Sequence, residues 1–87
     1  MKQISDKEIN EVYERRAMII AFNIAQVRKK KGLSQMELAF FTNTAQSVIL
    51  YAERGKNKQG KPYIPTMLTI EKIAVACNVT LMELIQR

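Results

Sequence analysis

The fold of this chain is decided by residues 33–55, LSQMELAFFTNTAQSVILYAERG, which predict two short helices joined by a tight turn. Ser34 and Glu37 have the spacing of a reciprocal capping box, so the first of these helices should start at Ser34. Asn43 is the expected turn residue, because asparagine tolerates a positive φ. Gly55 should end the second helix as a C-cap glycine does. The stretch therefore predicts a helix-turn-helix motif.

The second helix of this motif has two different faces. Val48, Ile49 and Ala52 fall at helical spacing and should face a core. The outward face is then formed by a mixture of amide, hydroxyl, aromatic and other side chains, namely Gln46, Ser47, Leu50, Tyr51 and Arg54. Amides and hydroxyls suit hydrogen bonding to base edges, whereas a merely solvated face would carry Glu and Lys. We expect this helix to be the working part of the chain.

Length and composition limit the size of the fold and the cellular location of the protein. With 87 residues, 47% of them hydrophobic and none of them tryptophan, the chain can form one domain with a modest aliphatic core. No apolar run is long enough to cross a bilayer, and the N-terminal residues lack the apolar segment of a signal peptide. We therefore expect a cytoplasmic protein without membrane contact. Cys77, the only cysteine, should be a buried hydrophobe, since the chain has no histidine to activate a thiol.

The net charge of +6 is concentrated in the middle of the chain. Residues 1–19 and 66–87 are each electrically balanced. The excess lies in residues 20–65, where Glu37 and Glu53 are outnumbered by Arg28, Lys29, Lys30, Lys31, Arg54, Lys56, Lys58 and Lys61. A basic collar around a helix-turn-helix motif is the electrostatic pattern expected for binding a polyanion. The alternative interpretation is a solubilising surface.

Helical patterns fill the rest of the chain. A first helix should begin near Asp6, after a Ser5 and Glu8 capping box, and end at the lysines before Gly32. Its apolar stripe is Ile9, Tyr13, Ala17, Ile20, Ile24 and Val27. This helix is long for a small domain, and a break near Arg15 to Met18 stays open. Two later helices are predicted by Thr66 as an N-cap, by Asn78 as a terminator and by a Thr80 and Glu83 capping box. No segment alternates with period two, so the fold class should be all-α.

Two parts of the chain leave alternatives open. Met18, Ile19, Phe22 and Ala25 place apolar groups on a second face of the first helix, which is either buried within the chain or a dimer contact. Residues 56–65 should form a loop whose lysines could lie on a phosphate backbone. Tyr63 and Ile64 in this loop are expected to fold back on the core or onto a partner.

The assembled residues resemble the phage repressor and Cro type of helix-turn-helix domain, also called the xenobiotic-response-element family. The likeness covers about Ile20 to Ile85. It is carried, in order, by Gly32-Leu33-Ser34-Gln35, Glu37-Leu38-Ala39, Ile49, Glu53-Arg54-Gly55, Pro65 and Asn78-Val79-Thr80. It implies a five-helix repressor-like domain over residues 20–87, with residues 1–19 as an N-terminal helical extension. Such domains usually bind double-stranded DNA as homodimers at two-fold symmetric operators and act as transcriptional repressors or regulators.

The resemblance also implies roles for individual residues. Gln46, Ser47 and Tyr51 match base-reading positions, and Ala45 and Leu50 could present methyl groups to thymine. Gln35 matches a position that contacts backbone phosphate, where Arg54, Lys56, Lys58 and Lys61 are also expected. Arg28 and Glu53 match a structural ion pair in relatives. Ala39 matches the small residue that lets the two motif helices approach closely.

Several residues depart from the family pattern. Asn43 stands where glycine is common. Ala45 stands where a Ser or Thr cap is usual, so Thr44 could cap the second helix one residue earlier and shift its register. Phe40 and Phe41 replace polar or small residues, and an exposed Phe40 would indicate a contact surface. The loop from Lys56 to Ile64 is longer than usual.

These patterns favour a sequence-specific DNA-binding regulator over other classes of function. The alternative is a protein-interaction module of the same fold, such as the antitoxin half of a toxin pair, with Phe40, Tyr63 and the N-terminal helix binding the partner. An enzyme is not expected, because no His, Gly-rich phosphate loop or carboxylate cluster is present, and neither a cofactor nor a metal is expected. RNA binding is compatible with the charge, although no aromatic stacking platform is evident.

Overall fold

The computed structural model describes residues 2–87, and these residues form five α-helices. The helices are α1 (Asp6–Lys31), α2 (Gln35–Thr42), α3 (Gln46–Arg54), α4 (Met67–Cys77) and α5 (Leu81–Ile85). Within the described range, β-structure is limited to one isolated bridge between Lys56 and Pro62. The predicted all-α class and five-helix architecture are confirmed.

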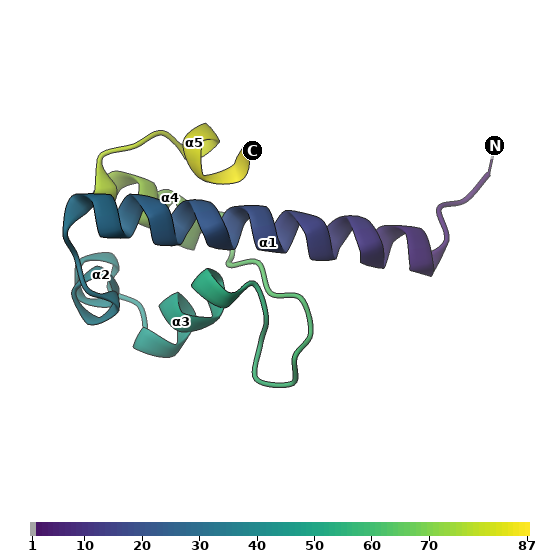
Figure 1. Cartoon of the computed structure of the whole chain (residues 1–87), viewed down its shortest axis with the longest axis horizontal. Coiled ribbons are helices and arrows are strands. Elements are labelled where there is room, and N and C mark those ends of the chain that lie inside the picture. The colour runs from purple at the N-terminus through teal and green to yellow at the C-terminus, as the bar shows by residue number, and fades with distance from the viewer. Residues whose placement is uncertain (1) are drawn as a thin grey trace.

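The long helix α1 organises the other four. It has 26 residues without a break, so the alternative of an interruption near Arg15 to Met18 is wrong. In Figure 1, α2 and α3 lie below α1, α5 lies above it and α4 passes behind it, while the N-terminal turns of α1 project beyond the other helices. The helix also runs unbroken through residues 19 and 20, where the sequence suggested a boundary between extension and domain. That division stays a prediction.

Most of the predicted helix ends are confirmed. Ser34 and Thr80 each form a complete capping box, with Glu37 and Glu83 respectively. The hydrogen bond with the backbone of Ser34 lowers the pKa of Glu37 below its ordinary value, because that bond is made to the charged carboxylate. The left-handed terminators are Gly32, Asn43, Gly55 and Asn78, and Thr66 caps α4. Because each cap links groups only a few residues apart, local sequence is sufficient to specify it.

The cap of α1 differs in detail from its prediction. The Ser5 hydroxyl accepts a hydrogen bond from the Glu8 backbone N–H at 3.1 Å, as expected. The Glu8 carboxylate, however, accepts from the Ser5 hydroxyl at 3.0 Å instead of returning to the backbone. The box is therefore one-sided, although α1 still begins at Asp6.

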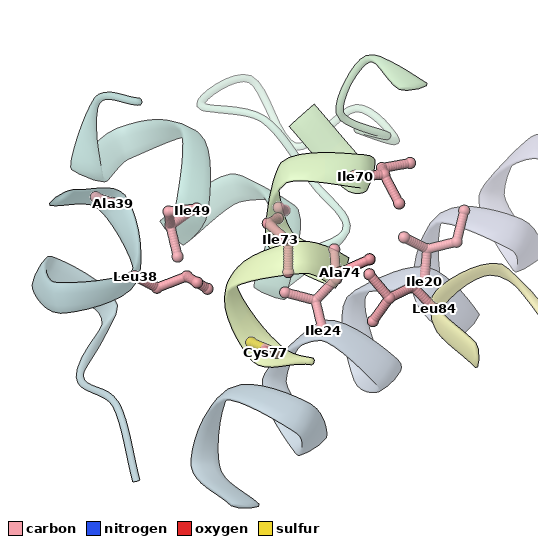
Figure 2. Packing of buried hydrophobic residues seen from close by; sticks show 11 residues of the cluster. Ile20, Ile24, Leu38, Ala39, Ile49, Ile70, Ile73, Ala74, Cys77 and Leu84 are labelled. Atoms are coloured by element: carbon pink, nitrogen blue, oxygen red, sulfur yellow. The ribbon is translucent and has the colours of Figure 1, made fainter. Parts of the chain in front are cut away.

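One hydrophobic core lies between the helices. Figure 2 shows Ile24 of α1, Leu38 of α2, Ile49 of α3, Ile73 of α4 and Leu84 of α5 converging on it. The cluster is completed by Ile20, Ala39, Ala52, Ile70, Ala74 and Cys77, so the predicted burial of the cysteine is confirmed. Burial raises the pKa of the Cys77 thiol, which keeps it protonated and unreactive. Tyr63 and Ile64 pack against the core, as predicted.

The apolar stripe of α1 is buried only in its second half. Burial begins at Ala17 and continues through Ile20 and Ile24. Ile9 and Tyr13, predicted to belong to the same buried stripe, remain 47% and 43% exposed. The reason is visible in Figure 1, where the first turns of α1 extend past the ends of the other helices. A periodic stripe predicts which face of a helix is apolar, but it does not predict how far the neighbouring helices reach.

Gly55, at the end of α3, sits directly against α1. Its φ of +69° belongs to the left-handed region, and a Cβ placed there would lie 3.0 Å from both the Ala17 carbonyl oxygen and the Met18 sulfur. Gly32, at the end of α1, has a similar φ of +79° but open space around the same position. Both positions need glycine for conformation, and Gly55 alone of these two also needs it for packing.

We expect Gly55→Ala to destabilise the protein by more than Gly32→Ala. Each substitution forces a Cβ into the left-handed region, at a cost of about 1–2 kcal/mol. Gly55→Ala also crowds the α1 backbone, which should add about 1–3 kcal/mol. Urea unfolding followed by circular dichroism measures both losses, and equal losses would contradict the close approach of α3 to α1.

Candidate DNA-binding surface

The inner face of α3 packs against the core, and the N-terminus of this helix has no side-chain cap. Ile49 and Ala52 are completely buried against the core. Ala45 is the N-cap residue and makes no side-chain hydrogen bond to the helix. The Thr44 hydroxyl instead bonds the Thr42 hydroxyl at 2.9 Å. The helix therefore begins at Gln46, and the earlier cap at Thr44, with its shifted register, does not occur.

The residues predicted to read bases fall into two groups. Ala45, Gln46 and Ser47 are exposed around the first turn of α3. Leu50 and Tyr51 are half-buried. The Tyr51 ring packs edge-to-face on the Tyr63 ring, with centroids 5.8 Å apart and an interplanar angle of 66°. The first turn therefore presents amide and hydroxyl groups freely, while Tyr51 is oriented by an aromatic neighbour from the following loop.

The position of α3 relative to α1 is set by a nearly buried ion pair. The Arg28 Nε and Nη2 atoms donate to the two carboxylate oxygens of Glu53, at 2.5 and 2.9 Å. The side chains of these two residues are 12% and 6% exposed. Donation to the Glu53 carboxylate raises the pKa of Arg28 above its ordinary value. The structure thus contains the pair that the resemblance implied, in the two-point geometry that fixes orientation as well as distance.

The same ion pair is also hydrogen-bonded to residues at and near the connection between α1 and α2. Arg28 Nη1 donates to the Leu33 carbonyl oxygen at 2.8 Å, and Gln35 Nε2 donates to Glu53 at 3.1 Å. Gln35, expected to contact backbone phosphate, is thus held by an intramolecular hydrogen bond. This bond was not predicted, because the two residues lie 18 positions apart and neither side chain carries a local signal for it.

The loop after α3 is tightly organised. The side-chain oxygen of Asn57 accepts hydrogen bonds from the backbone N–H groups of Gln59 and Lys61, at 2.9 and 3.0 Å. The Tyr63 N–H donates to the Gly55 carbonyl oxygen at 2.9 Å and ties the end of the loop to the end of α3. The sequence predicted a loop here but not the role of Asn57. An Asn followed three residues later by Gly was the available signal.

Basic side chains lie at and after the C-terminal end of α3. Arg54 at its C-terminus and Lys56, Lys58 and Lys61 in the loop are all exposed. The loop descends on the same side of α1 as α3 (Figure 1). Among residues 2–87, no group of three or more His, Cys, Asp or Glu side chains is placed to hold a metal ion. No described helix is both long and apolar enough to span a bilayer.

Comparison with known proteins places the chain in a family. The helix-turn-helix family of the Cro/C1 type matches residues 24–84, and the chain belongs to this family. It is therefore a protein of the helix-turn-helix DNA-binding class. A solved structure described as the hypothetical transcription factor NHTF from Neisseria is similar to it. The two share 25% sequence identity with a TM-score of 0.70, over 99% of this chain and 85% of the other. No match was found among curated proteins.

We expect Arg28→Ala to lower the free energy of unfolding by about 3 kcal/mol, because it leaves the nearly buried Glu53 carboxylate without its countercharge. The double variant Arg28→Met, Glu53→Met should lose less, since it removes both charges and leaves apolar groups in their place. Urea unfolding of both variants measures the difference. A double variant less stable than Arg28→Ala would show that the ion pair is not the source of the effect.

Proposed function

We propose that this protein is a sequence-specific transcriptional regulator, in the role of a repressor, that reads double-stranded DNA with α3. The main support is the first turn of α3, where Gln46 and Ser47 are exposed while the opposite face is locked into the core. A glutamine can present its amide bidentately to adenine, and an α-helix fits the major groove. The resemblance to a protein described as a transcription factor supports the same function.

In this proposal the groups around α3 bind the phosphate backbone. The N-terminus of α3 has no side-chain cap, and although the Val48 N–H donates to the Ala45 carbonyl oxygen, the N–H groups of Gln46 and Ser47 are free to approach a phosphate. Arg54, Lys56, Lys58 and Lys61 supply positive charge at the other end of the helix. Gln35 would join them by exchanging its bond to Glu53 for a phosphate oxygen. Such contacts give affinity and position, while the exposed side chains of α3 give specificity.

We further propose that the protein acts as a dimer on a two-fold symmetric operator. A single α3 reads only a few base pairs, and two copies related by a two-fold axis double both the contact area and the recognised sequence. The same symmetry is the commonest arrangement of homo-oligomers.

Gln46→Ala should relax the preference at one or two base pairs, at a cost of about 1–3 kcal/mol on the preferred sequence and little on a scrambled one. Lys58→Ala should weaken binding to both duplexes equally and reduce the salt dependence of binding. Lys7→Ala, which removes the same charge from the far end of α1, is the control. Fluorescence anisotropy titrations at several salt concentrations distinguish these effects.

Wild-type binding that is equal on the protein's own upstream region and on a scrambled duplex would contradict sequence-specific reading. Equal loss on both duplexes for Gln46→Ala would mean that α3 does not contact base edges.

A second candidate function is a protein-interaction module, such as an antitoxin. The observation that favours it is an apolar surface on α2 and α4, where Phe40 is 79% exposed. This surface also contains Met36, Phe41, Leu68 and Val75. It includes a groove of about 550 Å³ between Phe41, Leu68 and Val75. Tyr63 does not belong to it, because that ring is half-buried against Tyr51.

Co-expression with the protein encoded by the adjoining gene tests this alternative. An antitoxin should co-elute with that protein in size-exclusion chromatography, and Phe40→Ser should abolish the complex while the fold is retained. Lys58→Ala, at an exposed position in the loop after α3 and outside this apolar surface, serves as the control. Separate elution of the two wild-type proteins would exclude that partner.

A further inference from the structure

The outer face of α1 exposes apolar side chains in its middle. In Figure 1 this helix has α3 on its lower side, α5 on its upper side and α4 behind it. Helical spacing places Met18 and Phe22 on the face opposite the buried Ile20 and Ile24, and they are 47% and 62% exposed. The Met18 sulfur borders Gly55 at the end of α3. Met18 and Phe22 line a shallow groove of about 540 Å³ together with Arg15 and Ile19. An aromatic and a thioether side chain four residues apart on one helix face are suited to packing against another helix.

The exposed stripe around these two residues has the spacing of a coiled-coil seam. It consists of Glu11, Arg15, Met18, Phe22, Ala25 and Lys29, with alternating intervals of four and three residues. Glu11, Arg15 and Lys29 are exposed, and Ala25 is half-buried. The seam is apolar in the middle and carries a negative charge at one end and a positive charge at the other.

This stripe is arranged symmetrically about the point midway between Met18 and Phe22. Glu11 lies as far before that point as Lys29 lies after it, and Arg15 and Ala25 are related in the same way. If a second copy of the helix runs antiparallel and is centred there, Met18 of each copy meets Phe22 of the other. Glu11 of each copy then meets Lys29 of the other, and the long Arg15 side chain crosses the small Ala25. A parallel pair would instead place like charges together.

We propose that the outer face of α1 is the dimer interface, on which a second copy of this chain packs its own α1 in antiparallel orientation. The two-fold axis passes between Met18 and Phe22 and makes the contact isologous, so the same patch is used twice. The opposite charges at the two ends of the stripe favour a second copy in antiparallel orientation. The apolar side chains in the middle of the stripe are buried in the contact. The interface is one helix pair, so the dimer should be reversible.

The placement of α3 is compatible with this pairing. The two-fold axis is perpendicular to both α1 helices and to the direction that joins them. In Figure 1 that axis is vertical, and α3 lies below α1. Rotation about a vertical axis keeps the α3 helix of the second copy below as well, so both α3 helices face the same side. The interface itself is formed without DNA and does not depend on the proposed function. Only the use of the dimer on DNA rests on that function.

Other exposed apolar side chains are not arranged as one stripe of this kind. The surface of Phe40, Phe41 and Leu68 is divided between two helices, α2 and α4. Ile9 and Tyr13, on the projecting turns of α1, lie on a different face of that helix from Met18 and Phe22. The stripe from Glu11 to Lys29 is the surface where both shape and charge specify a second copy.

Reciprocal charge reversal tests the interface. Glu11→Lys and Lys29→Glu should each weaken self-association at least about tenfold, because each places like charges at both ends of the seam. The double variant Glu11→Lys, Lys29→Glu should restore it. An equimolar mixture of the two single variants should form a heterodimer in preference to either homodimer. Sedimentation equilibrium of the full chain at low ionic strength, without DNA, measures all four.

Two further variants exclude indirect effects. Lys30→Glu makes the same charge change one residue away but off the stripe, and it should leave self-association unchanged. Phe22→Glu should convert the protein to a folded monomer, with its circular dichroism and melting curve retained, since the Phe22 side chain is largely exposed.

A wild-type protein that is monomeric at every concentration would overturn the proposed interface, and so would equal effects of Lys29→Glu and Lys30→Glu. Anisotropy titration of the same samples with operator and scrambled duplexes is a separate readout. A monomer that still prefers the operator would leave the proposed function intact without this interface. A dimer that responds to charge reversal but shows no preference would support the interface without the proposed function.

Discussion

The structure depends most on the ion pair between Arg28 and Glu53. Charged groups are costly to remove from water, and this pair is nearly buried, so the fold that contains it must provide both partners in bonding geometry. The two hydrogen bonds join α1 to α3, the third donor of Arg28 holds the Leu33 carbonyl, and Gln35 brings in α2. Three helices are thereby joined at one carboxylate. A planar guanidinium meeting a planar carboxylate fixes rotation as well as separation, so the orientation of α3 on α1 is defined.

The inner and outer parts of α3 have separate roles. Ile49 and Ala52 anchor the helix in the core, and Gly55 allows its end to approach the backbone of α1. The exposed first turn keeps polar side chains available because neither a local cap nor a tertiary contact occupies them. The loop that follows is tied back to Gly55, so the backbone that carries its lysines has a defined position relative to α3. Rigid placement lowers the entropy lost when such side chains bind a partner.

The helix α1 connects the proposed DNA-binding surface with the proposed interface between subunits. One side of it carries Ile20 and Ile24 in the core, and Arg28 on its α3 side orients α3. Its outer side presents Met18 and Phe22 to solvent. Because these sides belong to one continuous helix, the orientation of α3 relative to a partner subunit would be set by a single rigid element. The proposed interface would then account for part of the length of this helix in addition to the core.

The sequence by itself determined the helices, their ends and the apolar face of each. Ser34, Asn43, Thr66 and Thr80 act on backbone groups within a few residues, so the sequence alone was enough to identify them. The family and the Arg28–Glu53 ion pair were predicted because the motifs occur in the order that is typical of this family. Tertiary structure alone decided that Gln35 bonds Glu53, that Tyr51 packs on Tyr63 and that the stripe of α1 is buried only from Ala17 onward. These features join groups distant in sequence or depend on where neighbouring helices end, and no local propensity encodes either.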